Sequence, residues 1–230
     1  MNYVIIGMGV AAISALDAIR SVDGTGSLTV IGADPHGFYS RPGLAYFLNG
    51  ELAEKNLFPL PKASFAKYQA KFRRAAVRRI LPQEQRIELS TGESIPYDRL
   101  LLAVGAAAVP IRIPGNDLQG VVKIDHLDDT KRIIKLAKRA RSAVVIGGGI
   151  TALELVEGLV ARKVRVHYFL RGERYWSSVL DADESRIILK RLQKEGVIVH
   201  TYTEAAEILG KRGKVIGVRT KDGETIKAKM

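Results

Sequence analysis

The sequence of 230 residues contains no cysteine. A chain without thiols forms no disulfide, offers no thiolate to zinc or to an iron–sulfur cluster, and has no cysteine to act as nucleophile or redox group. The four histidines have no spacing typical of metal ligands, and there is no Ser-His-Asp order, P-loop lysine motif or H-E-x-x-H motif. We therefore expect no metal site and no chemistry that depends on a thiol.

Long apolar runs are also missing. The longest weakly polar stretch, Leu100–Ile111, contains Gly105 and Pro110 and is shorter than the roughly 20 residues that a membrane-spanning helix needs. Met1-Asn2 leads directly into the apolar run Tyr3–Ile6, without the charged region and cleavage site of a secretory signal. The sequence thus predicts a cytoplasmic protein with no membrane span.

Acidic residues are in deficit: 24 Asp and Glu stand against 36 Lys and Arg, a formal net charge of +12. Such a charge attracts nucleic acids, acidic proteins and phosphorylated ligands alike. Two basic clusters, Lys71–Arg79 and Lys131–Arg141, carry no nucleic-acid motif and no interleaved aromatic residues beyond Phe72. We interpret the second cluster as the solvated face of a helix whose buried side contains Ile133 and Ala137, and we expect no nucleic-acid partner.

Two segments of the chain repeat one pattern. Each contains a short apolar run, a glycine-rich hexapeptide, an apolar helical pattern and a second apolar run. Runs of Val, Ile and Leu that alternate with helical patterns are typical of parallel strands buried on both faces, in βαβ units. The predicted strands are Tyr3–Ile6 and Ser27–Ile31 in the first segment, and Ala143–Ile146 and Val164–Leu170 in the second.

The remaining segments predict further elements. We expect loops around Tyr39–Pro61, helices at Ser64–Phe72 and Asp181–Glu195, strands at Leu100–Gly105 and Val197–Tyr202, and hairpins that pair Arg86–Leu89 with Glu93–Ile95 and Lys214–Arg219 with Glu224–Lys227. Proline and glycine in the segment 110–115 mark a boundary between domains. The chain therefore divides into residues 1–115 and 116–230.

The two glycine-rich hexapeptides have the spacing of a dinucleotide fingerprint. The first glycine allows a tight turn, the second lets a pyrophosphate approach the backbone, and the third position must be small so that helix and strand pack closely. The pyrophosphate then lies at the positive end of the helix. One copy is consistent with a mere strand–helix turn, but two copies predict two bound dinucleotides. The matching residues are Gly7, Gly9 and Ala12, and Gly147, Gly149 and Ala152.

The residue that binds the ribose is expected near the end of the second strand of each segment, roughly 20 residues after the fingerprint. Asp34 has this position in the first segment; the alternative is a turn residue before Pro35. In the second segment Arg171 follows the strand, and arginine binds a 2′-phosphate bidentately. We therefore expect NADPH to be favoured over NADH. Arg174 is a second candidate, unless it pairs with Glu173.

At these residues the sequence resembles the FAD-dependent pyridine nucleotide-disulfide oxidoreductase superfamily, in its branch of rubredoxin and ferredoxin reductases and the flavin subunit of nitrite reductase. Phe38–Leu44 is similar to the flavin-contacting loop of this branch, Tyr97–Gly105 to its A-T-G strand and Ile113–Gly115 to its I-P-G exit. The resemblance implies an α/β fold with two Rossmann-like, three-layer (ββα/αβα) domains, for FAD at 1–115 and NAD(P) at 116–230. Because the sequence stops at Met230, before the family's next strand, we expect a fragment or a truncated fold.

The resemblance also assigns roles to single residues. Arg41 and Pro42 would lie near the flavin, and the backbone of Val77 would contact the adenine of FAD. Glu154 would stand close to the nicotinamide and flavin rings as the catalytic residue; the alternative is a first-turn carboxylate that complements the helix dipole. Further contacts would come from Gly7, Gly9, Val10, Ala11, Ala12, Ala103, Val104 (where the family usually has threonine) and Gly105 for FAD, and from Gly147, Gly149, Ile150, Thr151 and Ala152 for NAD(P)H.

The implied activity is hydride transfer from NAD(P)H to FAD and passage of electrons to an external acceptor. Members that reduce disulfides or peroxide place a cysteine near the flavin loop, and Ser40–Gly43 has none, so that chemistry is excluded. The basic charge suits an acidic electron carrier of the rubredoxin or ferredoxin type, and a homo-oligomer is left open. The alternative function is a non-catalytic nucleotide-binding module, or a fragment, that acts through a protein partner. For Tyr175 and Trp176 we expect packing, with a nucleotide contact or an interface as alternatives.

Overall fold

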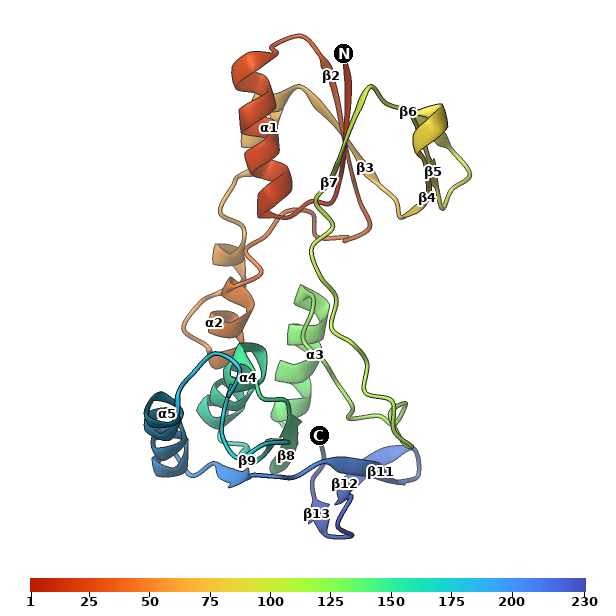
Figure 1. Cartoon of the computed structure of the whole chain (residues 1–230). Coiled ribbons are helices and arrows are strands. Elements are labelled where there is room, and N and C mark those ends of the chain that lie inside the picture. Colours follow the sequence, from red (N-terminus) through yellow and green to blue (C-terminus); the bar gives the residue numbers. More distant parts are fainter. The chain divides into compact units, whose positions relative to one another are not determined.

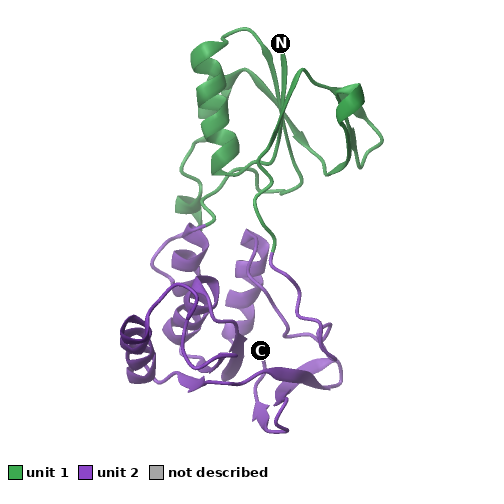
Figure 2. Cartoon of the chain, viewed as in Figure 1, with its two compact units in different colours: residues 1–41, 54–107 green, residues 42–53, 108–230 purple. Residues whose placement is uncertain are grey.

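The computed structural model describes residues 1–230, except for the side chain of Lys62. Its contacts divide the chain into two compact units, coloured separately in Figure 2. Unit 1 consists of residues 1–41 and 54–107, and unit 2 of residues 42–53 and 108–230. The segments 42–53 and 108–115, which precede the boundary expected at Gly115, thus pack with unit 2. In the described part of the chain, no helix has the length and apolar character of a membrane span.

Unit 1 has three layers (Figure 1). Its middle layer is a parallel sheet in the order β3-β2-β1-β7, formed by Ala70–Arg74, Ser27–Gly32, Asn2–Ile6 and Arg99–Leu102. Because side chains alternate along a strand, Ile5 packs with helix α1 (Val10–Val22), while Val4 and Ile6 pack with an antiparallel sheet on the other face. This outer sheet has the order β4-β5-β6, formed by Val77–Leu81, Arg86–Leu89 and Ser94–Pro96.

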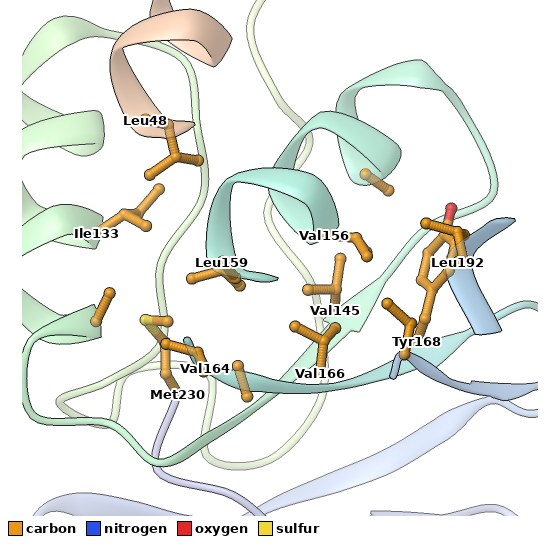
Figure 3. Packing of buried hydrophobic residues seen from close by; sticks show 14 of the residues in the cluster. Leu48, Ile133, Val145, Val156, Leu159, Val164, Val166, Tyr168, Leu192 and Met230 are labelled. Carbon is orange, nitrogen blue, oxygen red and sulfur yellow. The ribbon is translucent and has the colours of Figure 1, made fainter. Parts of the chain in front are cut away.

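Unit 2 repeats this plan. Its parallel sheet has the order β10-β9-β8, formed by Ile198–His200, Arg165–Phe169 and Ser142–Ile146. Figure 3 shows the main core, where Val145 and Val166 of the sheet lie near Val156 and Leu159 of helix α4 (Ile150–Ala161). The other helices of this core are α2 (Gly43–Asn49), α3 (Leu127–Ala137) and α5 (Ala182–Lys194).

The opposite face of the unit 2 sheet is covered by a second antiparallel sheet. Val144 and Phe169 pack there against Val218 and Ile226. The order of this sheet is β11-β12-β13, formed by Ala205–Lys211, Lys214–Thr220 and Thr225–Lys227. Both units therefore place a parallel sheet between helices and an antiparallel sheet, and the predicted α/β fold class is confirmed.

One predicted helix is wrong. Over residues 64–72 the chain forms a 3-10 helix, η2 (Lys62–Tyr68), and then strand β3. The left-handed backbone of Gln69, with φ 47°, separates the two. Phe65 of η2 and Phe72 of β3 still pack together, with ring centroids 5.3 Å apart, so the predicted helix consists of two shorter elements. The other 3-10 helices are η1 (Glu54–Leu57) and η3 (Pro82–Glu84).

Helix α2 forms inside the stretch that we expected to be loops, and it packs on α4. Leu48 is fully buried against Gly158, where a Cβ atom would lie 2.5 Å from the Leu48 Cγ. Arg162 donates hydrogen bonds to the carbonyl oxygens of Leu48 and Phe47, at 2.5 and 3.3 Å. A helix of seven residues is marginal by itself, so these contacts with α4 stabilise it.

Two histidines that are far apart in the sequence are neighbours in unit 2. Nδ1 of His167, on β9, lies 3.0 Å from Nε2 of His200, on β10. While both rings are neutral, one nitrogen donates and the other accepts. Burial, His200 and Arg165 lower the pKa of His167. His167 in folded unit 2 therefore binds a proton less readily than an exposed histidine does.

Candidate functional site

In both units the first strand continues into a glycine-rich loop and then into a helix. Loop 1 (Gly7–Gly9) joins β1 to α1, and loop 2 (Gly147–Gly149) joins β8 to α4. The first glycine of each loop has a positive φ, 120° at Gly7 and 148° at Gly147. Residues with a side chain rarely adopt such angles, so the local backbone already favours glycine at both positions.

The space around the first glycines is also restricted. A Cβ atom at Gly7 would lie 2.0 Å from the carbonyl oxygen of Ala103. At Gly147 it would lie 3.0 Å from the Cβ atom of Ala152. The fold itself therefore requires the first glycine of each loop, and most strictly in loop 1.

The second glycines, Gly9 and Gly149, differ from the first. Their φ angles of −88° and −114° are open to any residue. A Cβ atom at either position would meet no atom of the described residues within 4 Å. Neither backbone conformation nor packing within the protein thus requires glycine, whereas a group that approaches the backbone from outside would.

The helices that follow the two loops begin without side-chain caps. Gly9 and Gly149 are the N-cap residues of α1 and α4, and neither helix has an acidic residue in its first turn. By contrast, α5 has a complete capping box, in which Asp181 Oδ1 accepts from the Glu184 N–H at 2.8 Å. The uncapped N–H groups of α1 and α4 are suited to bind an anion.

The helix positions after the loops divide into buried and exposed. The third fingerprint residues are buried, Ala12 at 0% and Ala152 at 8% exposure, as close packing of helix and strand requires. The preceding helix residues are exposed in both units, with Val10 and Ala11 in α1 and Ile150 and Thr151 in α4. Exposed aliphatic side chains next to anion-binding N–H groups fit a ligand with both apolar and phosphate parts.

Three predicted residues of unit 1 lie around loop 1 or the end of β7. Ala103 donates its N–H to the Ile6 carbonyl at 2.8 Å, and its own carbonyl faces Gly7. Val104 is exposed, and Gly105 has φ 67°. Val77, by contrast, begins strand β4 of the outer sheet, where it pairs with Leu89. The structure thus brings Ala103 to loop 1 and places Val77 in another layer of the unit.

The predicted ribose and flavin residues Asp34 and Arg41 lie together in unit 1. A carboxylate oxygen of Asp34 is 3.6 Å from the Arg41 guanidinium and accepts from the Tyr39 hydroxyl at 3.0 Å. Its other oxygen accepts from the His36 N–H at 2.9 Å. Asp34 therefore has the turn role that we considered, together with a charged partner. Pro42, the next predicted residue, is the N-cap of α2 in unit 2.

The predicted phosphate-binding arginines follow β9 in unit 2. Arg171 is exposed, and Arg174 is half-buried. Nε of Arg174 is buried and has no hydrogen-bond partner among the described residues. Both arginines follow the carboxyl end of β9, the end of the sheet at which dinucleotides bind in such folds.

Glu154 lies in the second turn of α4. Its interpretation as a first-turn carboxylate is wrong, because that turn contains no acidic residue. Burial and the neighbouring Glu157 raise the pKa of Glu154, and burial likewise raises the pKa of Glu157. Glu154 therefore keeps its proton to a higher pH than an exposed glutamate does, a property common at reaction sites.

Unit 2 also contains a cavity of about 990 Å³ beside loop 2. Its wall includes Gly149 and Ile150 at the start of α4, Ile146 at the end of β8, and Trp176. Small-molecule sites commonly have volumes of about 300–1,000 Å³ and mostly apolar walls. The position of Trp176 in this wall could not be read from sequence spacing, because it arises from tertiary packing.

The comparisons with known proteins agree with these observations. A family model described as pyridine nucleotide-disulphide oxidoreductase matches residues 1–230. Over 231 residues the chain is 28% identical to nitrite reductase (NAD(P)H) of Bacillus subtilis, with 100% of this chain and 29% of that protein covered. Over 232 residues it is 26% identical to rubredoxin-NAD(+) reductase of Pseudomonas putida, with 100% and 60% covered.

Among solved structures, a ferredoxin reductase of Rhodopseudomonas palustris superposes on this chain with a TM-score of 0.94 at 24% identity. The match covers 100% of this chain and 57% of that one. The chain thus spans less than two thirds of each of these three proteins. The resemblance and the fold inferred from the motifs are confirmed.

Proposed function

Because the chain belongs to the pyridine nucleotide-disulphide oxidoreductase family, we propose that loop 1 holds FAD and loop 2 holds NAD(P)H in an oxidoreductase that passes electrons to an external acceptor. The family supports binding of both cofactors. In this proposal residues 1–115 belong to the FAD-binding domain and residues 116–230 to the NAD(P)-binding domain. A cytoplasmic location is part of the same proposal.

The observation that carries the proposal is the space at Gly9 and Gly149. Each is a glycine without a conformational or packing reason inside the protein, at the start of a helix without a side-chain cap. A pyrophosphate supplies the missing reason, since it needs close approach to the backbone and free N–H groups. The same combination occurs in both units, as two dinucleotides require.

The remaining predicted residues receive their roles within this proposal. Asp34 would bind the ribose of FAD, and Arg41, its ion-pair partner, would lie near the flavin. Glu154 would be the catalytic residue beside the reacting rings. Backbone and small side chains would hold the rest of the cofactors: Gly7, Val10, Ala11, Ala12, Pro42, Val77, Ala103, Val104 and Gly105 for FAD, and Gly147, Ile150, Thr151 and Ala152 for NAD(P)H. When bound, the cofactors supply the hydride and electron transfer, and the chain binds and orients them.

The electron acceptor in this proposal is an acidic carrier protein of the rubredoxin or ferredoxin type. The relative in Pseudomonas putida is named for rubredoxin. The net charge of +12 favours encounter with an acidic protein. No cysteine of this chain takes part, since it has none.

We further propose that NADPH binds more tightly than NADH. Arg171 and Arg174 follow β9 at the place where an NAD site has an acidic residue, and the buried Nε of Arg174 lacks a partner among the described residues. Replacement of Arg171 by glutamate would narrow the difference, because a carboxylate repels the 2′-phosphate. Calorimetric titration of wild type and Arg171→Glu with each nucleotide measures this; equal affinities in the wild type refute the preference.

Absorbance tests the function as a whole. The purified protein, as isolated or after incubation with FAD, should show a flavin spectrum that bleaches when NADPH is added without oxygen. Replacement of Glu154 by glutamine should slow the bleaching while both cofactors still bind. A protein that takes up no FAD and shows no bleaching, yet binds a nucleotide, would instead be the non-catalytic module.

A further inference from the structure

The loop between β9 and α5 contains a backbone conformation that costs free energy. Trp176 has φ 46°, in the left-handed region that bulky residues rarely occupy. Its N–H donates to the Gly148 carbonyl at 2.9 Å, and its carbonyl accepts from the N–H groups of Val179 and Leu180, each at 2.9 Å. A strained residue that is held in this way directly beside loop 2 indicates a functional role.

The preceding residue, Tyr175, adds a second cost at the same place. Its side chain is completely buried, yet its hydroxyl has no hydrogen-bond partner in the described chain. The carbonyl of Tyr175 accepts from the buried Ser185 hydroxyl of α5 at 2.7 Å. Its ring meets the Trp176 ring edge to face, with centroids 6.0 Å apart. Tyr175 thus fixes Trp176 to the core of unit 2.

The hydrogen bond from Trp176 determines how one peptide group of loop 2 points. In a trans peptide the carbonyl and the following N–H lie on opposite sides. Because the Gly148 carbonyl points toward Trp176, the N–H of Gly149 points away from it. Gly149 is the residue with open space around its Cα atom and the N-cap of α4. The main chain of Trp176 therefore orients a donor toward the space in which a phosphate would bind.

The indole of Trp176 has a separate role. Trp176 lines the cavity together with Gly149, Ile150 and Thr151, and it also packs on the core of unit 2. A half-buried aromatic ring in such a wall offers a rigid face for the planar rings of a nucleotide. This chain has no other tryptophan.

We propose that Trp176 is a positioning residue for the pyridine dinucleotide: its main chain orients loop 2, and its indole contacts the bound nucleotide. The inference rests on the proposed function, since it takes loop 2 as the NAD(P)H site. It explains why the fold retains two unfavourable features beside an otherwise regular strand–helix turn, the unpartnered hydroxyl of Tyr175 and the left-handed backbone of Trp176.

Tryptophan emission, excited at a wavelength that tyrosine does not absorb, tests the contact directly, because Trp176 is the one tryptophan of this sequence. NADPH, NADH and ADP-ribose are titrated into the protein, and binding of each is measured in parallel by calorimetry. We expect NADPH and NADH to quench the emission at the same concentrations at which they bind. Gly149→Ser is the matched control: it keeps the indole but fills the space at loop 2, so quenching should disappear.

Substitutions at position 176 separate the ring from the backbone. Trp176→Phe keeps an aromatic ring and should bind NADPH within about twofold of wild type. Trp176→Ala and Trp176→Gly both remove the ring and should bind about tenfold more weakly, the order of magnitude of one lost stacking contact. Glycine adopts a positive φ without strain, so Trp176→Gly keeps the main-chain hydrogen bond even where Trp176→Ala loses stability. Thermal unfolding of each variant shows whether the protein is folded.

The outcomes distinguish this inference from the proposed function. If NADPH binds by calorimetry but leaves the emission unchanged, and folded Trp176→Gly binds as tightly as wild type, the role of Trp176 is refuted while loop 2 remains a nucleotide site. If Gly149→Ser binds and is quenched like wild type, loop 2 is not that site. If no nucleotide binds to the wild type, the proposed function and the inference fail together.

Discussion

Loops 1 and 2 have the same glycine pattern but different reasons for it. Gly7 is confined by the carbonyl of Ala103, which follows the neighbouring strand β7 and is far away in the sequence, whereas Gly147 is confined by Ala152 of its own helix. Loop 1 is thus fixed by tertiary structure and loop 2 by local structure and the hydrogen bond from Trp176. At Gly9 and Gly149 the two loops are alike, since both positions are open. The first glycine therefore serves the fold, and the second serves a ligand.

The largest effect should come from adding a methyl group at Gly7. Gly7→Ala places Cβ 2.0 Å from a backbone oxygen at a φ of 120°, and we expect a loss of about 4 kcal/mol or more in unit 1. Gly147→Ala meets only a side-chain methyl at 3.0 Å and should cost about 2 kcal/mol in unit 2.

Urea unfolding measures both variants. Far-UV circular dichroism follows the whole chain, and the emission of Trp176 follows unit 2 alone. Equal losses for Gly7→Ala and Gly147→Ala would contradict the difference between the loops.

A smaller loss of stability, confined to unit 2, should follow when the contacts that hold helix α2 are removed. Arg162→Met keeps the aliphatic stem but removes the donors to Leu48 and Phe47. We expect unit 2 to lose about 1–2 kcal/mol, because two partly buried carbonyls lose a charged donor, and unit 1 to be unaffected. Arg139→Met, at an exposed position of unit 2, is the control. If both variants unfold alike by Trp176 emission, Arg162 does not hold α2.

Acid should affect unit 2 before unit 1. The fold lowers the pKa of His167, so the unfolded chain binds a proton there more readily than the folded chain does. The stability that unit 2 has while His167 is neutral is therefore lost as pH falls below about 6.5. In unit 1, hydrogen bonds from Gly26, Thr25 and Tyr3 lower the pKa of Asp23 to about 2, so that contribution is lost only between about pH 4 and pH 2.

The variant His167→Gln isolates the histidine effect. Between pH 8 and pH 5.5, wild type should lose more stability than His167→Gln, by less than about 1 kcal/mol because the ring is only half-buried. Trp176 emission during urea unfolding at each pH measures the difference. Parallel pH profiles for the two proteins would exclude His167 as the titrating group.

The smallest effect on stability belongs to the second glycines. Serine is a favoured N-cap residue, and the space at Gly9 and Gly149 accepts its side chain. The free energies of unfolding of Gly9→Ser and Gly149→Ser should therefore lie within about 0.5 kcal/mol of the wild-type value, or slightly above it. A large loss in either variant would show that the fold, and not a ligand, needs that glycine.

The features that the sequence predicted well are those with a local cause. Buried parallel strands, both fingerprints and the capped helix α5 are encoded by neighbouring residues, and so they appear as expected. Helix α2 was missed because its stability comes from Gly158 and Arg162, far along the chain. Residues 64–72 were misassigned because the left-handed backbone of Gln69, which ends η2 before β3, is set by the fold and has no glycine or proline to announce it. The hydrogen bond from Trp176 to Gly148 leaves no signal in the sequence, since main-chain contacts do not depend on residue type.

The most direct test of two separate nucleotide sites is a calorimetric titration of wild type, Gly9→Ser and Gly149→Ser with FAD and with NADPH. The account predicts that Gly9→Ser loses FAD and keeps NADPH, and that Gly149→Ser loses NADPH and keeps FAD, each by at least about tenfold in affinity. If both ligands are lost together in one variant, or if neither substitution changes either affinity, the assignment of one dinucleotide to each loop is contradicted.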